Sequence, residues 1–377
     1  MSAMAKRMLG LIGSLALVAA VVWVTPDALS AQARRPTPSQ VNALRTADGH
    51  PDFTGVYDVA TMTPLERPAG LGDRLVLTPQ EASALEQYEA NRNDKDAEPV
   101  RGDRPAPPVG GVKLTPRSYL EFLFRAGGGA VGGYNLIWLA PGSRVITVNG
   151  EKRSSIIVDP PDGRAPRMTP EAARRNAAFL AYAASPDASE GGAGGGANAY
   201  DGPEARPLAE RCLLGFGSTS GPPALPNYFY NNLKQIVQTG DTVMIYNEMV
   251  HDARIIRIGG KHIPASIERW MGDSVAHWEG DTLVIDTTNF TDKTKFNGSS
   301  EKLHVVERLT RTDEKTLLYR FTVDDPTTWE RPWTGEYPWV ASNQMWLEYA
   351  CHEGNYALSN VLRGARVQEK APRGSKP

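Results

Sequence analysis

Apolar and polar residues alternate along most of the chain from residue 230 onward. A period of two residues is typical of β-strands that bury one face. Gly240-Asp241 and Gly280-Asp281 stand between neighbouring segments, and such pairs favour the tight turns of hairpins. The predicted strands are 233–238, 242–247, 251–258, 274–278, 282–288, 303–311, 315–323, 333–340 and 344–351.

A long antiparallel meander must protect its two edge strands. Closure into a barrel protects them most completely, and a two-sheet sandwich is the alternative. We therefore expect a mainly β protein, in which an up-and-down antiparallel meander over residues 204–368 closes into a barrel.

Residues 34–184 predict a β/α part that packs on the barrel. Thr78-Pro79-Gln80-Glu81 has the pattern of a capping box and predicts a helix to residue 92. Thr169-Pro170-Glu171 predicts a second helix that ends near residue 184. The remaining predicted strands are 53–59, 134–140, 144–149 and 153–159.

Two stretches outside these elements have biased composition. Residues 185–203 are rich in Gly, Ala and Ser and predict a linker or a loop insertion. Residues 369–377 predict a disordered tail. The Gly-rich stretch 126–133 lacks the Gly-Lys-Ser/Thr of a phosphate-binding loop, so we interpret it as a flexible loop.

The first 33 residues have the order of a secretory signal peptide. Lys6 and Arg7 precede an uncharged apolar stretch, 8–24, and Ala31-Gln32-Ala33 offers a cleavage site. An uncleaved anchor is the alternative interpretation, since the apolar stretch is at the short end of what spans a bilayer. We expect a periplasmic or secreted protein with no membrane attachment after cleavage.

Composition and cysteine content narrow the function. The formal net charge is −2, so no basic surface for nucleic acid is indicated. Hydrophobic residues make up 41% and charged residues 22% of the chain, which is ordinary for a globular protein. In an oxidising compartment Cys212 and Cys351 predict one disulfide, and two free buried thiols are the alternative.

Candidate functional groups share one face of several predicted strands. Side chains alternate between faces along a strand, so His304 and Arg308 share one face of the predicted strand 303–311, and Val305 and Glu307 share the other. In an antiparallel sheet such a polar face often points to solvent. If it points into the barrel, it lines a polar cavity, and the first two functional hypotheses below depend on that arrangement.

The candidate catalytic residues are His304, His352 and Glu348. Imidazole exchanges protons near neutral pH, and a carboxylate can orient it or share its proton. Asp286 is an alternative carboxylate partner. The candidate ligand-binding residues are Arg254, Arg308, Arg320, His251, Asp286 and Trp346, with the guanidinium groups as anion contacts.

The motifs of other chemistries are missing from the sequence. His251, His304 and His352 show neither HExxH nor HxH spacing, so we predict no metal site. Ser218 is not in a G-x-S-x-G elbow. We also predict no cofactor.

Three hypotheses for the function follow. In the first, the barrel cavity binds a small amphipathic or anionic molecule. In the second, the protein is a lyase, isomerase or hydratase that uses histidine acid/base catalysis in the same cavity. In the third, it is a non-catalytic cell-envelope protein that uses exposed tryptophans to bind a partner.

Several blocks of sequence resemble a family of exported, β-rich bacterial proteins, most of them uncharacterised. The blocks are SSIIVDPPDGRAPRMTPEA, NEMVHDARIIRI, GDSVAHWEGDTLVIDTTNFTDKTKF, HVVERLTRTDEKTLLYRFTVDDPTTWERPW and EYACHEGNY. They extend over residues 48–366. The resemblance implies export and a β-rich fold, which is similar to lipocalin-like barrels by fold pattern alone. It assigns no role to any residue.

Overall fold

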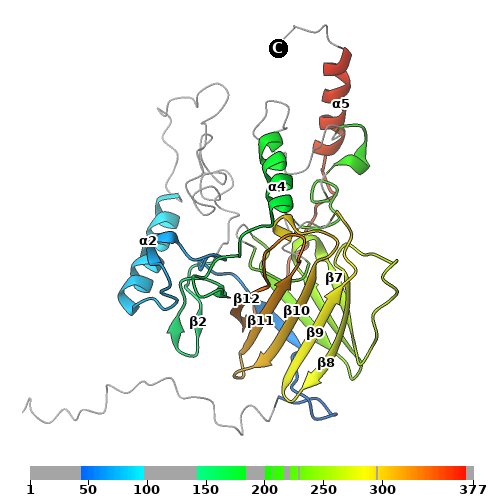
Figure 1. The fold of residues 1–377 in the computed structure, drawn as a ribbon. Helices are drawn as coiled ribbons and strands as arrows, with labels where there is room; N and C mark the ends of the chain where they lie inside the picture. Colours follow the sequence, from blue (N-terminus) through cyan, green and yellow to red (C-terminus); the bar gives the residue numbers. More distant parts are fainter. Residues whose placement is uncertain are drawn as a thin grey trace, which may run out of the picture.

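Nine β-strands close into a barrel at the centre of the protein (Figure 1). The computed structural model describes residues 44–96, 142–183, 200–206, 208–215, 221–227, 230–293 and 296–370. The barrel strands are β1 (Gly55–Asp58), β5 (Leu233–Gln238), β6 (Thr242–Asn247), β7 (Ala253–Ile258), β8 (Asp273–Glu279), β9 (Thr282–Thr288), β10 (His304–Arg311), β11 (Thr316–Asp324) and β12 (Trp333–Ala341).

The barrel closes through the N-terminal strand β1. This strand pairs with β5 on one side and with the end of β12 on the other, where Tyr57 lies opposite Ala341. The start of β12 pairs instead with β4 (Ile157–Asp159), which lies outside the ring. The predicted barrel is therefore confirmed, but residues before 204 complete it.

One strand pair departs from the predicted antiparallel meander. β7 and β8 run parallel, with Arg257 opposite Val275. Parallel neighbours need a long crossover connection instead of a tight turn, and residues 259–272 provide it. The barrel is thus mixed, although its other pairings are antiparallel.

Apolar and aromatic side chains fill the interior of the barrel. In β10, Val305, Glu307 and Leu309 are 0% exposed, whereas His304 and Arg308 on the other face are partly exposed. The face with His304 and Arg308 therefore lies on the outer wall and not in the interior, where the first two functional hypotheses require it. The largest fully buried side chains of the strands are Tyr57, Tyr319, Phe321, Trp333, Tyr337 and Trp339.

A charged network crosses this interior. Arg254 donates two hydrogen bonds to Glu307, at 2.5 and 2.8 Å, and the Tyr319 hydroxyl donates a third at 2.7 Å. Tyr319 accepts a hydrogen bond from the backbone N–H of Ala224, and Tyr337 donates to the carbonyl of the same residue. The segment 221–227 is thereby fixed to the barrel interior.

Both predicted helices are present. α2 (Pro79–Asp96) has the expected capping box: the N–H of Thr78 donates to Glu81 at 2.8 Å, and the N–H of Glu81 donates to the Thr78 hydroxyl at 3.2 Å. α4 (Pro170–Ala183) begins with the Thr169 hydroxyl accepting from the N–H of Ala172. The short strands β2 (Thr147–Val148) and β3 (Glu151–Lys152) form a separate hairpin.

The C-terminal region differs most from the expectation. Residues 344–350 form no regular element, although the alternation there predicts a strand. They lead to α5 (Ala357–Lys370), a helix that we did not predict and that includes the first residues of the expected tail. In Figure 1, α4 and α5 project from one end of the barrel, and α2 lies beside it.

The remaining short helices are 3-10 turns. They are η2 (Ala69–Leu71), η4 (Pro203–Ala205), η5 (Met249–His251) and η6 (Phe296–Gly298). The predicted signal peptide 1–33, the strand 134–140 and residues 184–199 lie outside the described residues. No helix of the described residues combines the length and the apolar character needed to cross a bilayer.

The predicted disulfide joins Cys212 to Cys351, with 5.7 Å between the Cα atoms. It links residues 139 positions apart, and it ties the segment before α5 to the segment 208–215. In the chain-entropy model, closure of so long a loop stabilises the fold by up to about 5 kcal/mol.

Candidate functional site

A carboxylate between two imidazoles marks the outer wall of the barrel. Asp286 of β9 contacts Nε2 of His304 through one oxygen, at 2.8 Å, and Nε2 of His262 through the other, at 2.9 Å. Asp286 lies opposite Val306 in the β9–β10 ladder, so His304 is its diagonal neighbour, within reach of a long side chain. All three side chains are accessible from solvent, with exposed fractions between 29% and 39%.

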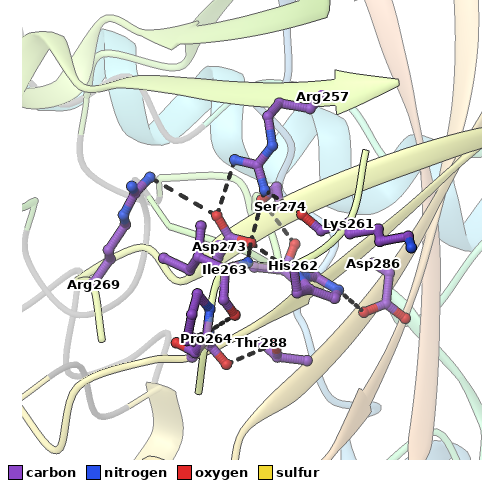
Figure 2. Close-up of polar contacts among 12 residues, drawn as sticks. Arg257, Lys261, His262, Ile263, Pro264, Arg269, Asp273, Ser274, Asp286 and Thr288 are labelled. Atoms are coloured by element: carbon purple, nitrogen blue, oxygen red, sulfur yellow. Dashed lines mark hydrogen bonds and ion pairs between the residues drawn. The ribbon is translucent and has the colours of Figure 1, made fainter. Parts of the chain in front are cut away.

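A second carboxylate orients His262. Asp273 accepts from Nδ1 of His262 at 3.0 Å, and its side chain is 0% exposed. Arg257 donates to both oxygens of Asp273, at 3.1 and 3.0 Å, and the N–H of Ile263 adds a further hydrogen bond. Figure 2 shows Asp273 between Arg257 and His262, with Asp286 beyond the imidazole ring. The order of contacts is thus Asp273, His262, Asp286, His304.

The crossover segment 259–272 carries His262 to this position. The Asn289 side chain, just after β9, donates to the carbonyl of Ile263 at 3.1 Å, and the backbone carbonyl of Asn289 accepts from the N–H of Arg269 at 2.8 Å. The N–H of Thr291 donates in turn to the carbonyl of Arg269. Because the segment is fixed at two points, the imidazole of His262 is held against the barrel wall.

The electrostatics of the site keep the carboxylates ionised. Burial by itself raises the pKa of Asp273, but the hydrogen bonds from Arg257, Ile263 and His262 outweigh it and lower the pKa. The hydrogen bond with His304 lowers the pKa of Asp286, and the same contact raises the pKa of His304. Asp286 and His304 are therefore both charged over a wider pH range than they would be if they did not contact each other.

The contacts of His262 allow one proton to move. Ionised carboxylates only accept hydrogen bonds, and a neutral imidazole has one N–H to donate. Neutral His262 can therefore donate to Asp273 or to Asp286 but not to both. Both contacts are hydrogen bonds when His262 carries two N–H groups, or when an oxygen of Asp286 carries a proton. The contact between His262 and Asp286 is thus a place where a proton can be taken up and released with little movement of heavy atoms.

The structure brings two of the sequence-predicted site residues together, His304 and Asp286. The other predicted residues lie elsewhere. Arg254 is buried against Glu307 inside the barrel. Trp346 stacks on Tyr246, with 5.0 Å between the ring centroids. His251, Glu348 and His352 are exposed, and no contact joins their side chains to His304 or Asp286 within the described residues.

Two further predicted residues share the outer wall with His304. Arg308 donates to Glu279, and Arg320 donates to Glu336 at 2.7 Å. Their side chains are 38% and 43% exposed. They therefore lie on the same face of the sheet as Asp286 and His304, although not in hydrogen-bond contact with them.

His262, Asp273 and Arg257 are site residues that the sequence pattern did not indicate. His262 lies in a connection that has no motif, and Asp273 stands just before the predicted strand 274–278. One signal was present: the connection over residues 259–273 is too long for a tight turn, as is the connection over 289–302. Long connections in compact domains are often functional.

Comparison of the chain with protein-family models, with curated proteins and with solved structures found no match. Among the described residues, no group of three or more His, Cys, Asp or Glu side chains is arranged to hold a metal ion. The function is therefore inferred from the geometry of the Asp273–His262–Asp286–His304 cluster, which we call the acid/base cluster.

Proposed function

We propose that this protein is an enzyme that transfers a proton to or from a small molecule, as lyases, isomerases and hydratases do. The observation that carries the proposal is the acid/base cluster. The carboxylate of Asp286 and the partly exposed imidazole of His304 lie side by side on the outer wall. His262 contacts Asp286 from the other side and is oriented by the buried carboxylate of Asp273. General acid/base catalysis requires groups with this reach and these protonation states.

Each member of the cluster has a role in the proposed mechanism. Asp286 accepts the proton of the substrate and shares it with Nε2 of His262. Asp273 compensates the positive charge that then develops on His262, as the buried aspartate of a His–Asp dyad does. His304, whose pKa the contact with Asp286 raises, donates a proton to the other end of the reacting bond.

The small-molecule site is proposed on the outer wall because the interior of the barrel is occupied. Tyr319, Tyr337 and Trp339 are 0% exposed inside it, and Arg254 donates to Glu307 through two nitrogens. Binding of an anion by Arg254 would have to break this buried ion pair, at a cost of several kcal/mol.

The proposal includes export to the periplasm or the medium. The disulfide between Cys212 and Cys351 supports it, since disulfides persist in oxidising compartments. Export is tested by fractionation of cells that express the full chain. Recovery of the protein in the cytoplasm, with residues 1–33 still attached, would contradict it.

Deuterium exchange tests the acid/base function across many reaction types at once. The wild-type protein is incubated in D2O with a panel of small ketones, hydroxy acids, sugar acids and unsaturated acids, and the products are followed by mass spectrometry. We expect deuterium incorporation or conversion for at least one compound. Asp286→Asn should slow it about 100-fold or more, because general acid/base groups typically contribute that much.

Asp159→Asn is the matched control, since Asp159 is exposed and pairs with Arg331 away from the cluster. It should keep the wild-type rate, and both variants should unfold at the wild-type temperature. If no compound exchanges with the wild-type protein, or if Asp286→Asn exchanges as fast, the acid/base function is wrong.

A further inference from the structure

Two arginines face each other on the wall that carries the acid/base cluster. Arg308 of β10 and Arg320 of β11 are direct partners in the antiparallel ladder, and both side chains are on the outer face. Partners of this kind have Cα atoms about 5 Å apart. Like charges directly opposite each other on a sheet are destabilising, so the pair needs either compensation or a function.

The positive charges of the two arginines are compensated by carboxylates on either side of the pair. Glu279 of β8 accepts from Nη2 of Arg308, at 2.5 Å, and Glu336 of β12 accepts from Nη1 of Arg320, at 2.7 Å. One carboxylate is on the β8 side and the other on the β12 side, and no carboxylate contacts both arginines among the described residues. Each guanidinium has five N–H donors, and the described contacts use one nitrogen of each.

The arginine pair is displaced from Asp286 both along the strands and across them. Arg308 is opposite Val284, and Asp286 is two residues further along the same strand. Two residues of a strand span about 7 Å. Arg308 is on the strand next to Asp286 and Arg320 is one strand further, and neighbouring strands are about 4.8 Å apart. An anion between the two guanidinium groups would therefore lie about 10 Å along the sheet surface from the carboxylate that accepts the proton, a distance that a substrate of several bonded atoms spans, with the side chain of Val306 between them.

We propose that Arg308 and Arg320 bind the oxyanion of the substrate, a carboxylate or a phosphate, while Asp286 and His304 act on its proton-bearing carbon. The substrate class is thus a small organic acid or a phosphate ester. This inference rests on the proposed acid/base function. Arginine suits the role because its planar fork donates to two oxygens of such an anion at once.

Binding of simple anions tests the inference without turnover. The mature protein is titrated with inorganic phosphate and, separately, with acetate at constant ionic strength, and the Nε–H signals of its arginines are followed by NMR. We expect saturable shifts at Arg308 and Arg320. Tighter binding of phosphate would indicate a phosphate ester as the substrate, and tighter binding of acetate a carboxylate. Arg308→Gln should weaken binding at least tenfold.

Arg331→Gln is the matched control, because Arg331 is also exposed and paired with a carboxylate, Asp159. It should bind both anions as the wild-type protein does. If neither anion shifts the two arginines, or if Arg308→Gln binds as tightly as the control variant, the anion site is wrong.

The acid/base function would survive that failure, because its own test is the loss of exchange in Asp286→Asn. Conversely, if the protein binds anions but exchanges no compound, the anion site is supported and the proposed acid/base function is wrong. When a substrate has been found, Arg308→Gln should raise KM and change kcat little. A fall in kcat at unchanged KM would contradict a role in anion binding.

Discussion

Lys234 is the residue at which burial and charge conflict most clearly. It lies on β5 with its side chain inside the barrel, is 2% exposed, and donates to the Asn247 side chain at 2.8 Å. Burial, together with the nearby charge of Arg254, lowers its pKa from 10.5 to about 7. Arg254 itself remains charged because Glu307 neutralises it. The barrel interior thus holds one stable ion pair and one lysine that releases its proton near neutrality.

This lysine makes the stability of the protein depend on pH. Between about pH 7 and the usual lysine value near 10.5, the unfolded chain binds a proton that the folded protein does not bind. The free energy of unfolding should therefore rise with pH across this window. Below about pH 7 the folded protein must hold the charge in its interior, and the full penalty applies. Urea unfolding at a series of pH values measures the slope.

Lys234→Met removes the titrating group, so its stability should be higher than wild type at pH 6 and should vary less with pH. Lys315→Met, at an exposed position, is the control and should keep the wild-type slope. Equal slopes for wild type and Lys234→Met would show that Lys234 does not titrate in this range.

At the level of single residues, two of the four members of the acid/base cluster could be predicted from the sequence. Asp286 and His304 stand at alternating positions of two adjacent strands, so their pairing follows from the β pattern once the register is known. His262 and Asp273 do not follow from that pattern, because a crossover connection brings the imidazole back over the wall. Arg254, which we predicted to bind a ligand, is buried inside the barrel and binds Glu307 of β10.

Among the elements, β12 is the most constrained strand. It pairs with β11 along its length, with β4 at its start and with β1 at its end. Gly335 is at the register shift between β12 and β4. A Cβ atom there would lie 2.5 Å from the ring of Phe321 and 3.1 Å from Ile156. The crowding explains why this position has no side chain.

Gly335→Ala should therefore destabilise the protein by about 1–3 kcal/mol, the usual cost of overpacking a core. Chemical denaturation followed by tryptophan fluorescence measures the loss. Gly240→Ala is the matched control, since a Cβ atom at Gly240, in the β5–β6 turn, meets nothing within 4 Å. The interpretation of Gly335 is wrong if the two variants are equally stable.

The C-terminal segment shows why one strand was predicted incorrectly. Residues 344–350 have the alternation of a strand, but the barrel is already closed when the chain reaches them. β1 and β4 occupy the edge of β12 that a further strand would need. Met345 and Leu347 are consequently 78% and 56% exposed. Local alternation cannot show that β1, which ends 286 residues before residue 344, completes the ring. It does predict β5, β6 and β9 with their observed bounds, because these strands pair with their neighbours in sequence.

For the whole molecule, the disulfide is the covalent link between the C-terminal segment and the segment 208–215, beside the ring contact of Trp346 with Tyr246 and a few hydrogen bonds. Cys351 is at the end of the unpaired segment before α5, and none of the residues of α5 is buried. The barrel has its own complete ladder of strand pairs. We therefore expect the reduced protein to keep the barrel and to lose order first in the C-terminal segment.

Loss of the disulfide, by reduction or by Cys212→Ser with Cys351→Ser, should lower the free energy of unfolding by about 2–5 kcal/mol. Guanidinium unfolding with and without reductant measures this loss, and amide hydrogen exchange locates it. The double variant serves as the control, since reductant should not change it further. Unchanged stability after complete reduction would contradict the prediction.

Because β7 and β8 are parallel, the residues that close the barrel are different from those that place a side chain beside Asp286. Strand order and barrel closure depend on the ladder, whereas the identity of the group that meets Asp286 depends on the crossover 259–272. The hydrogen bonds of Asn289 anchor this segment at Ile263 and Arg269. A substitution within the segment that keeps these bonds would therefore change the group beside Asp286 and leave the pairing of the strands unchanged.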